Sequence, residues 1–180
     1  MAVANGAKGF THTYNGMTPL GHRANGVTGA AFRFHNTFAE IICDGNHSTL
    51  TALNIFFREK QNYAVMVTDS LMCKGYPVGS VFDFGGQDVE IYPDGSAHIT
   101  TGKKQLAGST LKVNVGIKIL VEQALVPFEQ AIDAASLNPM RYIGMDDHKG
   151  KICAGYDADI VVLGDDYSVV QTYCKGVAQL

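Results

Sequence analysis

The sequence predicts an α/β fold built around a parallel sheet, with a ligand site at the carboxyl edge of that sheet. Three segments carry this prediction, because each is a short apolar or β-branched run that ends abruptly in polar residues: 8–15 (KGFTHTYN), 38–47 (FAEIICDGNH) and 63–70 (YAVMVTDS). Strands buried on both faces form continuous apolar runs, and strands that alternate with helices indicate a parallel sheet. In such sheets, ligands bind beyond the carboxyl ends of the strands.

The segments between these runs have helical or loop character. The stretch 48–61 (STLTALNIFFREKQ) carries apolar residues at helical spacing, and Ser48 is suited to cap its amino-terminal end. The glycine-rich stretch 22–36 leaves room for a loop and one or two short helical turns. We therefore expect strands and helices to alternate through the first 70 residues.

A glycine-rich insertion follows Asp69. Within it, the stretch 87–101 (QDVEIYPDGSAHITT) predicts two strands joined at Asp94 and Gly95, because Asp-Gly is a favoured pair in tight turns. We expect this insertion to interrupt the alternation of strands and helices.

Helical signals resume after the insertion. Ser109 can cap a helix that runs through Val121, and Pro127 can open another over 127–137. The stretch 157–174 then predicts two more strands around an acidic turn. The only plausible domain boundary falls near 149–155.

Composition excludes several classes of protein. The chain has 180 residues, 46% hydrophobic and 17% charged, which is typical of a globular domain, and its net charge of -3 with scattered basic residues does not favour nucleic-acid binding. No apolar stretch approaches the roughly 20 residues that span a bilayer. The four cysteines include no CxxC pair, which favours reduced thiols. We expect a soluble protein of the cytoplasm.

Polar residues at the strand ends are the candidates for chemistry. His12 could bind a metal, although a lone histidine is more often structural. Asp69 should face a desolvation cost and suits a general base, or else it caps the next segment. His47 could bind an anionic or sugar substrate, and the guanidinium of Arg23 suits phosphate or carboxylate, although both residue types are common on solvated surfaces. Neither a nucleotide-binding glycine motif nor a GxSxG elbow is present.

Seven motifs, taken in order, resemble the carboxyl-terminal half of N-acetylglucosamine-6-phosphate deacetylases, members of the metal-dependent amidohydrolase superfamily. They cover nearly the whole chain: THTYNGM (11–17), HRANGVTGA (22–30), IICDGNH (41–47), VMVTDS (65–70), LAGSTL (106–111), ASLNP (135–139) and GYDADIVVLGDD (155–166). The resemblance implies a (β/α)8 barrel with a small β-sandwich made from both chain termini. Residues 1–149 would supply the last three barrel strands, and residues 150–180 the carboxyl-terminal strands of the sandwich.

The resemblance also implies roles for nine residues in the metal-dependent hydrolysis of an acetamide. His12 would bind a divalent metal, zinc or iron, and Asp69 would be the catalytic acid and base. The other seven would contact an amino-sugar phosphate: Asn15 and Gly16 at the sugar phosphate, Arg23 and His47 at the phosphate and sugar, and Leu106, Ala107 and Gly108 beside the substrate.

The chain departs from the family in ways that leave alternatives open. Gly16 stands where the family often has alanine, and Ser48-Thr49 where a second histidine is common. The family's glutamate and further histidine ligands have no counterpart here, so we expect little or no activity from this chain alone. It could instead be a non-catalytic sugar-phosphate-binding or assembly module, or an amidohydrolase with another substrate. As partners we expect a second copy, since the family forms dimers, or a separate amino-terminal half.

Overall fold

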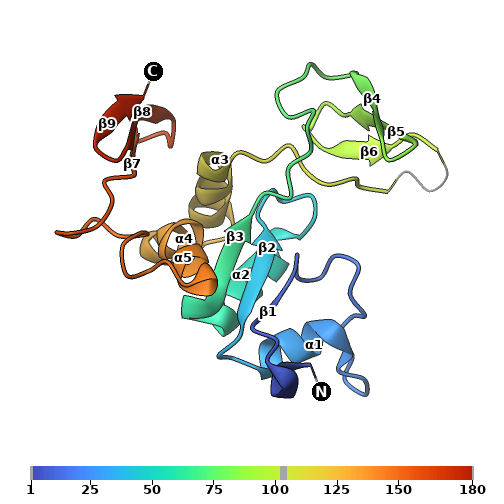
Figure 1. The fold of residues 1–180 in the computed structure, drawn as a ribbon. Coiled ribbons are helices and arrows are strands. Elements are labelled where there is room, and N and C mark those ends of the chain that lie inside the picture. The colour runs from blue at the N-terminus through green and yellow to red at the C-terminus, as the bar shows by residue number, and fades with distance from the viewer. Residues whose placement is uncertain (1, 102–104, 180) are drawn as a thin grey trace.

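The computed structural model describes residues 2–101 and 105–179, which form a central α/β unit and two smaller sheets (Figure 1). The central sheet has the order β1-β2-β3, and both pairs of neighbouring strands are parallel. The predicted parallel sheet is therefore confirmed. The elements of this first part are η1 (Val3–Asn5), β1 (Gly9–Phe10), α1 (Gly26–Arg33), β2 (Phe38–Ile42), α2 (Leu50–Lys60), η2 (Gln61–Tyr63) and β3 (Ala64–Val67).

The main hydrophobic core lies between this sheet and the helices packed against it. Ile41 of β2 and Phe56 of α2 are fully buried there, and Leu120 joins them from the later helical segment. Tyr14, in the segment after β1, packs against the same core, and its hydroxyl donates a hydrogen bond to the Ala52 carbonyl of α2, at 3.2 Å. The loop after β1 is thus anchored on α2.

The cap of α2 differs from the expectation, whereas α1 agrees with it. Thr49, and not Ser48, caps α2, because its extended backbone lets its hydroxyl accept a hydrogen bond from the Ala52 amide, at 3.2 Å. Ser48 is instead buried. The stretch 22–36 contains the eight-residue helix α1, about two turns long, as expected.

The insertion forms a separate antiparallel sheet, which we call the arm (the described residues from 71 to 107). It contains β4 (Val81–Phe84), β5 (Gln87–Ile91) and β6 (Ala97–Ile99), and it extends away from the central unit (Figure 1). The two predicted strands and their turn are confirmed, since Gly95 has a positive φ of 80° and Asp94 accepts a hydrogen bond from the Ser96 amide. The sequence analysis did not identify β4.

The helices after the arm are only partly as expected. Helix α3 (Val113–Lys118) begins four residues beyond Ser109 and continues as the π-helical segment η3 (Ile119–Gln123), so the predicted Ser109 cap is wrong. The Ser109 hydroxyl donates to the Thr68 carbonyl and accepts from the Leu111 amide. Pro127 does precede helix α4 (Phe128–Ala135), as predicted, and α5 (Leu137–Ile143) follows.

The last sheet is small and exposed. It comprises β7 (Ile160–Leu163), β8 (Val169–Cys174) and β9 (Val177–Gln179), all antiparallel, and none of its residues is buried. The two strands predicted over 157–174 are confirmed, and β9 adds a third. No helix in the described part of the chain is long and apolar enough to cross a membrane.

A buried lysine connects α1 to α2. The Lys60 side chain is 1% exposed, and its amine donates hydrogen bonds to the carbonyls of Ala31, at 3.0 Å, and Phe34, at 2.9 Å. Burial lowers the pKa of this amine to about 8. At the carboxyl-terminal end of α1, Lys60 thus shares the Phe34 carbonyl with the Thr37 amide and hydroxyl, and it also bonds to the Ala31 carbonyl.

We predict that Lys60→Met lowers the free energy of unfolding at pH 7 by about 1–3 kcal/mol, because the Ala31 carbonyl loses its buried donor and the Phe34 carbonyl loses one of its donors. Between pH 8 and 10.5 the unfolded state binds more protons at Lys60 than the folded state, so the wild type should gain stability as pH rises. Chemical denaturation of both proteins across this range measures the difference in stability, which should grow with rising pH because only the wild type gains stability.

Lys118→Met is the matched control, because the Lys118 amine is partly exposed and lies 3.9 Å from the Glu122 carboxylate. It should change stability by less than about 0.5 kcal/mol. Equal losses in the two variants would contradict the role given to Lys60.

Candidate active site

The loops that follow β1, β2 and β3 leave the sheet at the same edge, because the three strands are parallel. His12 lies in the first loop, His47 in the second and Asp69 in the third. The first loop stays against the sheet, since the Thr13 amide donates a hydrogen bond to the Glu40 carbonyl of β2, at 2.7 Å. The sheet thus brings the three predicted strand-end residues to one edge.

Unpartnered polar atoms gather at this edge. Among the described residues, the buried side-chain nitrogen or oxygen atoms without a hydrogen-bond partner are His12 Nδ1, Thr13 Oγ1 and Ser48 Oγ. All three follow β1 or β2. Because a buried polar atom without a partner costs free energy, such atoms indicate contacts with water or a ligand.

The backbone is also strained here. His12 and Asp69 have positive φ values of 31° and 48°, which residues other than glycine seldom adopt. Each follows a strand and turns the chain sharply out of the sheet. Strain of this kind is common at functional sites, where the surrounding structure maintains it.

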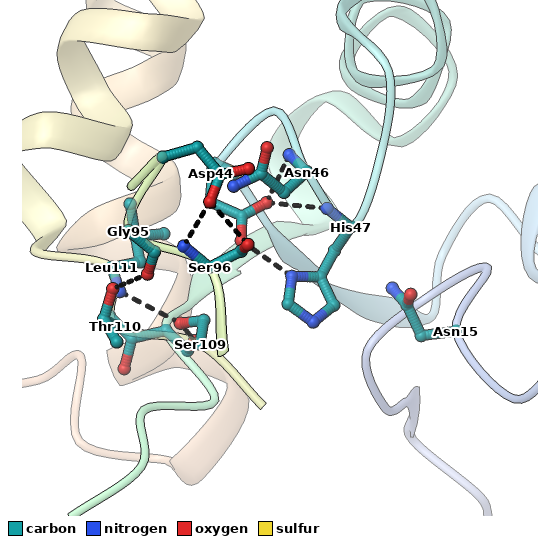
Figure 2. A network of polar contacts seen from close by, with 12 residues as sticks. Asn15, Asp44, Asn46, His47, Gly95, Ser96, Ser109, Thr110 and Leu111 are labelled. Carbon is teal, nitrogen blue, oxygen red and sulfur yellow. Dashed lines mark hydrogen bonds and ion pairs between the residues drawn. The ribbon is translucent and has the colours of Figure 1, made fainter. Parts of the chain in front are cut away.

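A carboxylate that the sequence analysis missed holds His47 (Figure 2). Asp44 Oδ2 lies 2.7 Å from His47 Nδ1, and Asp44 Oδ1 accepts hydrogen bonds from the backbone amides of Asn46 and His47, at 2.9 and 2.8 Å. Burial alone would raise the pKa of Asp44, but the hydrogen bonds from His47 and Asn46 outweigh it and lower the pKa. The Asp-Gly pair in CDGNH is a turn signal that could have identified Asp44.

Asp69 is fixed by its backbone. Its carbonyl accepts a hydrogen bond from the Ser109 amide, at 2.8 Å, and the Ser109 carbonyl accepts one from the Leu71 amide, at 2.9 Å. The expected desolvation of Asp69 is wrong, because the residue is exposed. The chain turns out of the sheet two residues after β3 ends, so the carboxylate leaves the apolar surroundings of the strand.

Of the segment 106–108, Gly108 lies beside Asp69. Ala107 pairs with β6 of the arm, since its amide donates to the Ala97 carbonyl at 2.9 Å. Gly108 has a φ of 56°, and a Cβ atom there would lie 2.9 Å from the Asp69 carbonyl oxygen. Only glycine fits this close approach without displacing Asp69.

The first loop places its predicted residues differently. Asn15 is half-buried, and its amide donates to the Thr13 carbonyl at 3.4 Å. In the view of Figure 2 it lies on the side of the His47 ring away from Asp44. Gly16 is exposed with a φ of 65°, and a Cβ atom there would meet only the His12 ring, at 4.0 Å. Arg23 is exposed.

The described residues do not form a complete metal site. They contain no group of three or more histidine, cysteine, aspartate or glutamate side chains that could hold a metal ion. Three protein ligands and a water are usual in catalytic zinc sites. His12, with its unpartnered buried nitrogen, fits one ligand position only.

Comparison with known proteins identifies the family. The sequence pattern of the amidohydrolase family matches residues 29–178, which is most of the chain. The chain belongs to the amidohydrolase family. The resemblance to its deacetylases is confirmed by curated relatives named N-acetylglucosamine-6-phosphate deacetylase, which include proteins of Bacillus subtilis (36% identity, 97% of this chain) and Homo sapiens (34% identity, 97% of this chain). The chain spans 43% of the length of each of these two relatives.

Solved structures of deacetylases share the fold. The chain superposes on N-acetylglucosamine-6-phosphate deacetylase of Pasteurella multocida with a TM-score of 0.93 and 26% identity, over 99% of this chain and 46% of that one. The superposition on the Thermotoga maritima enzyme has a TM-score of 0.90 and 30% identity, and it covers 98% of this chain and 48% of that enzyme. A variant of the Mycobacterium smegmatis enzyme was solved in complex with N-acetyl-D-glucosamine-6-phosphate. Its superposition has a TM-score of 0.89 and 25% identity, and it covers 98% of this chain and 46% of that enzyme.

We predict that Gly108→Ala destabilises the protein by about 2–4 kcal/mol, because the new methyl group meets the Asp69 carbonyl and the Leu71 side chain while φ stays positive. Gly85→Ala is the matched control, since Gly85 has a similar φ of 63° but open space around its Cα. Its loss should be about 1 kcal/mol. Thermal unfolding of both variants measures the difference, and a loss at Gly85 as large as that at Gly108 would contradict the close approach.

Proposed function

We propose that this chain carries the substrate-binding and proton-transfer residues of a deacetylase that acts on N-acetylglucosamine 6-phosphate. The extent of the match supports this most strongly, because relatives with this name align with 97% of the chain. The clustering of unpartnered polar atoms at one sheet edge supports the same location for the site. The products would be glucosamine 6-phosphate and acetate.

Asp69 would move the proton. Its exposed carboxylate would take a proton from the attacking water as the water oxygen bonds to the acetamide carbon. When the carbon–nitrogen bond then breaks, Asp69 would return the proton to the leaving amine. The hydrogen bond from the Ser109 amide to the Asp69 carbonyl would hold the residue in place through both steps.

The remaining predicted residues would bind the substrate. We assign Asn15, Gly16, Arg23 and His47 to the sugar phosphate, and the segment 106–108 to the side of the site beside Asp69. The charge of the Arg23 guanidinium and the location of His47 at the sheet edge suit a phosphate monoester.

The catalytic site would need residues beyond those described. We propose His12 as one ligand of a divalent cation, zinc or iron, whose other ligands come from elsewhere. The parallel order β1-β2-β3 supports an assignment of residues 1–149 to the last three strands of a (β/α)8 barrel, and of residues 150–180 to part of a β-sandwich. On this assignment the described residues alone would have little or no activity, because they offer His12 as the single proposed metal ligand.

Two other functions have some support. Relatives named N-acetylgalactosamine-6-phosphate deacetylase occur in Escherichia coli O157:H7 (33% identity, 95% of this chain) and, provisionally so named, in strain K12. The chain covers 96% of the K12 protein, which favours the epimeric sugar as a second candidate substrate. The incomplete metal site favours a non-catalytic sugar-phosphate-binding module.

Acetate release tests the proposal. The chain should be assayed with each acetylated sugar phosphate, alone and co-expressed with the part of the Bacillus subtilis deacetylase that it does not match. We expect activity only in the co-expressed complex, with a preference for the glucosamine derivative. Sugar-phosphate binding with no acetate release under either condition would instead support the non-catalytic module.

Within an active complex, we predict that Asp69→Asn lowers kcat by at least about 100-fold, because the amide cannot accept or return the proton. Binding of inorganic phosphate should change by less than about threefold, since the proposed phosphate contacts are Arg23 and His47 and not Asp69. Steady-state kinetics and calorimetry measure the two effects. A variant that retained kcat would rule out Asp69 as the acid and base.

A further inference from the structure

The contact between Asp44 and His47 goes beyond what the family resemblance assigned. The two side chains are nearly buried, with 11% and 6% exposed, and Asp44 uses both of its oxygens: Oδ2 contacts the His47 ring, and Oδ1 accepts two backbone amides. All these contacts lie within one turn of four residues. The turn therefore determines the orientation of the imidazole by itself.

The carboxylate also decides which ring nitrogen is free. An ionised carboxylate only accepts hydrogen bonds, so His47 Nδ1 must donate to Asp44. Among the described residues no group bonds to the other nitrogen, Nε2, which lies on the side of the ring away from the carboxylate (Figure 2). Nε2 is therefore the atom that a ligand can reach.

We propose that Asp44 is a positioning residue for phosphate recognition, which holds the Nδ1–H of His47 so that Nε2 contacts the phosphate of an amino-sugar 6-phosphate. This inference rests on the proposed function. Because a phosphate dianion also only accepts, Nε2 must carry a proton in the complex. The bound ring is then an imidazolium between two anions, and Asp44 compensates its charge.

The variant Asp44→Asn separates this role from general electrostatics. The two backbone amides require an oxygen at the Oδ1 position, so the new amide nitrogen must face His47 Nδ1. Nδ1 then accepts, and the proton of the neutral ring moves to Nε2. Removal of a negative charge near a phosphate should strengthen binding by simple Coulomb attraction, whereas loss of the Asp44 partner should weaken it.

The first measurement is the tautomer of His47 in the free chain, from nitrogen-15 NMR of histidine-labelled protein. We expect the proton on Nδ1 in the wild type and on Nε2 in Asp44→Asn. A wild-type ring protonated on Nε2 alone would overturn the proposal. This measurement on the wild type is decisive even if the Asp44→Asn variant does not fold.

The second measurement is calorimetric binding of glucosamine 6-phosphate, inorganic phosphate and unphosphorylated glucosamine to the chain. Asp44→Asn should raise Kd for the two phosphates about tenfold, leave glucosamine unchanged, and cause no further weakening in a His47→Gln background. Asp166→Asn is the matched control, because Asp166 accepts the Ser168 amide in an exposed turn and its loss changes net charge equally.

Unchanged or tighter phosphate binding by Asp44→Asn would overturn the proposal, as would additive effects of the two substitutions or no phosphate binding by the wild type. Failure of acetate release in the co-expressed complex, with phosphate binding intact, would instead refute only the proposed reaction. The two failures are therefore distinguishable.

Discussion

Parallel pairing of β1, β2 and β3 is the constraint on which the rest of the structure depends. Each strand is short, β1 with only two residues, so the sheet relies on the helices that cover it. Because the strands run the same way, the loops that carry His12, His47 and Asp69 leave at one edge although up to 57 residues separate them in the chain. An antiparallel neighbour would have placed one of these loops at the opposite edge.

The arm shows how a long insertion can leave this edge intact. It has its own small core, in which Val89 and Ala97 are fully buried, separate from the core of the central unit. Its two ends meet where Ser109 pairs with Asp69 and Leu71. The same backbone contacts that close the insertion therefore hold Asp69 in its strained conformation.

Local patterns predicted the parts of the fold that local physics decides. The apolar runs of β2 and β3, the Asp94-Gly95 turn and the Pro127 helix start were all correct, because each depends on neighbours in sequence. Ser109 was misassigned as a cap because its partner, Thr68, lies 41 residues away. The exposure of Asp69 also depends on where the chain leaves the sheet, which an apolar run does not indicate.

In the candidate site too, some features depend on contacts between neighbours in sequence and others depend on distant residues. His47 is oriented by Asp44 three residues earlier, and Asn15 contacts Thr13 two residues earlier, so one turn of chain is enough to form each. A metal centre needs ligands from several strands, and the described residues contain no group of three or more side chains that could hold a metal ion. Phosphate binding should therefore be separable from hydrolysis in this chain, because only the second depends on residues that local turns cannot provide.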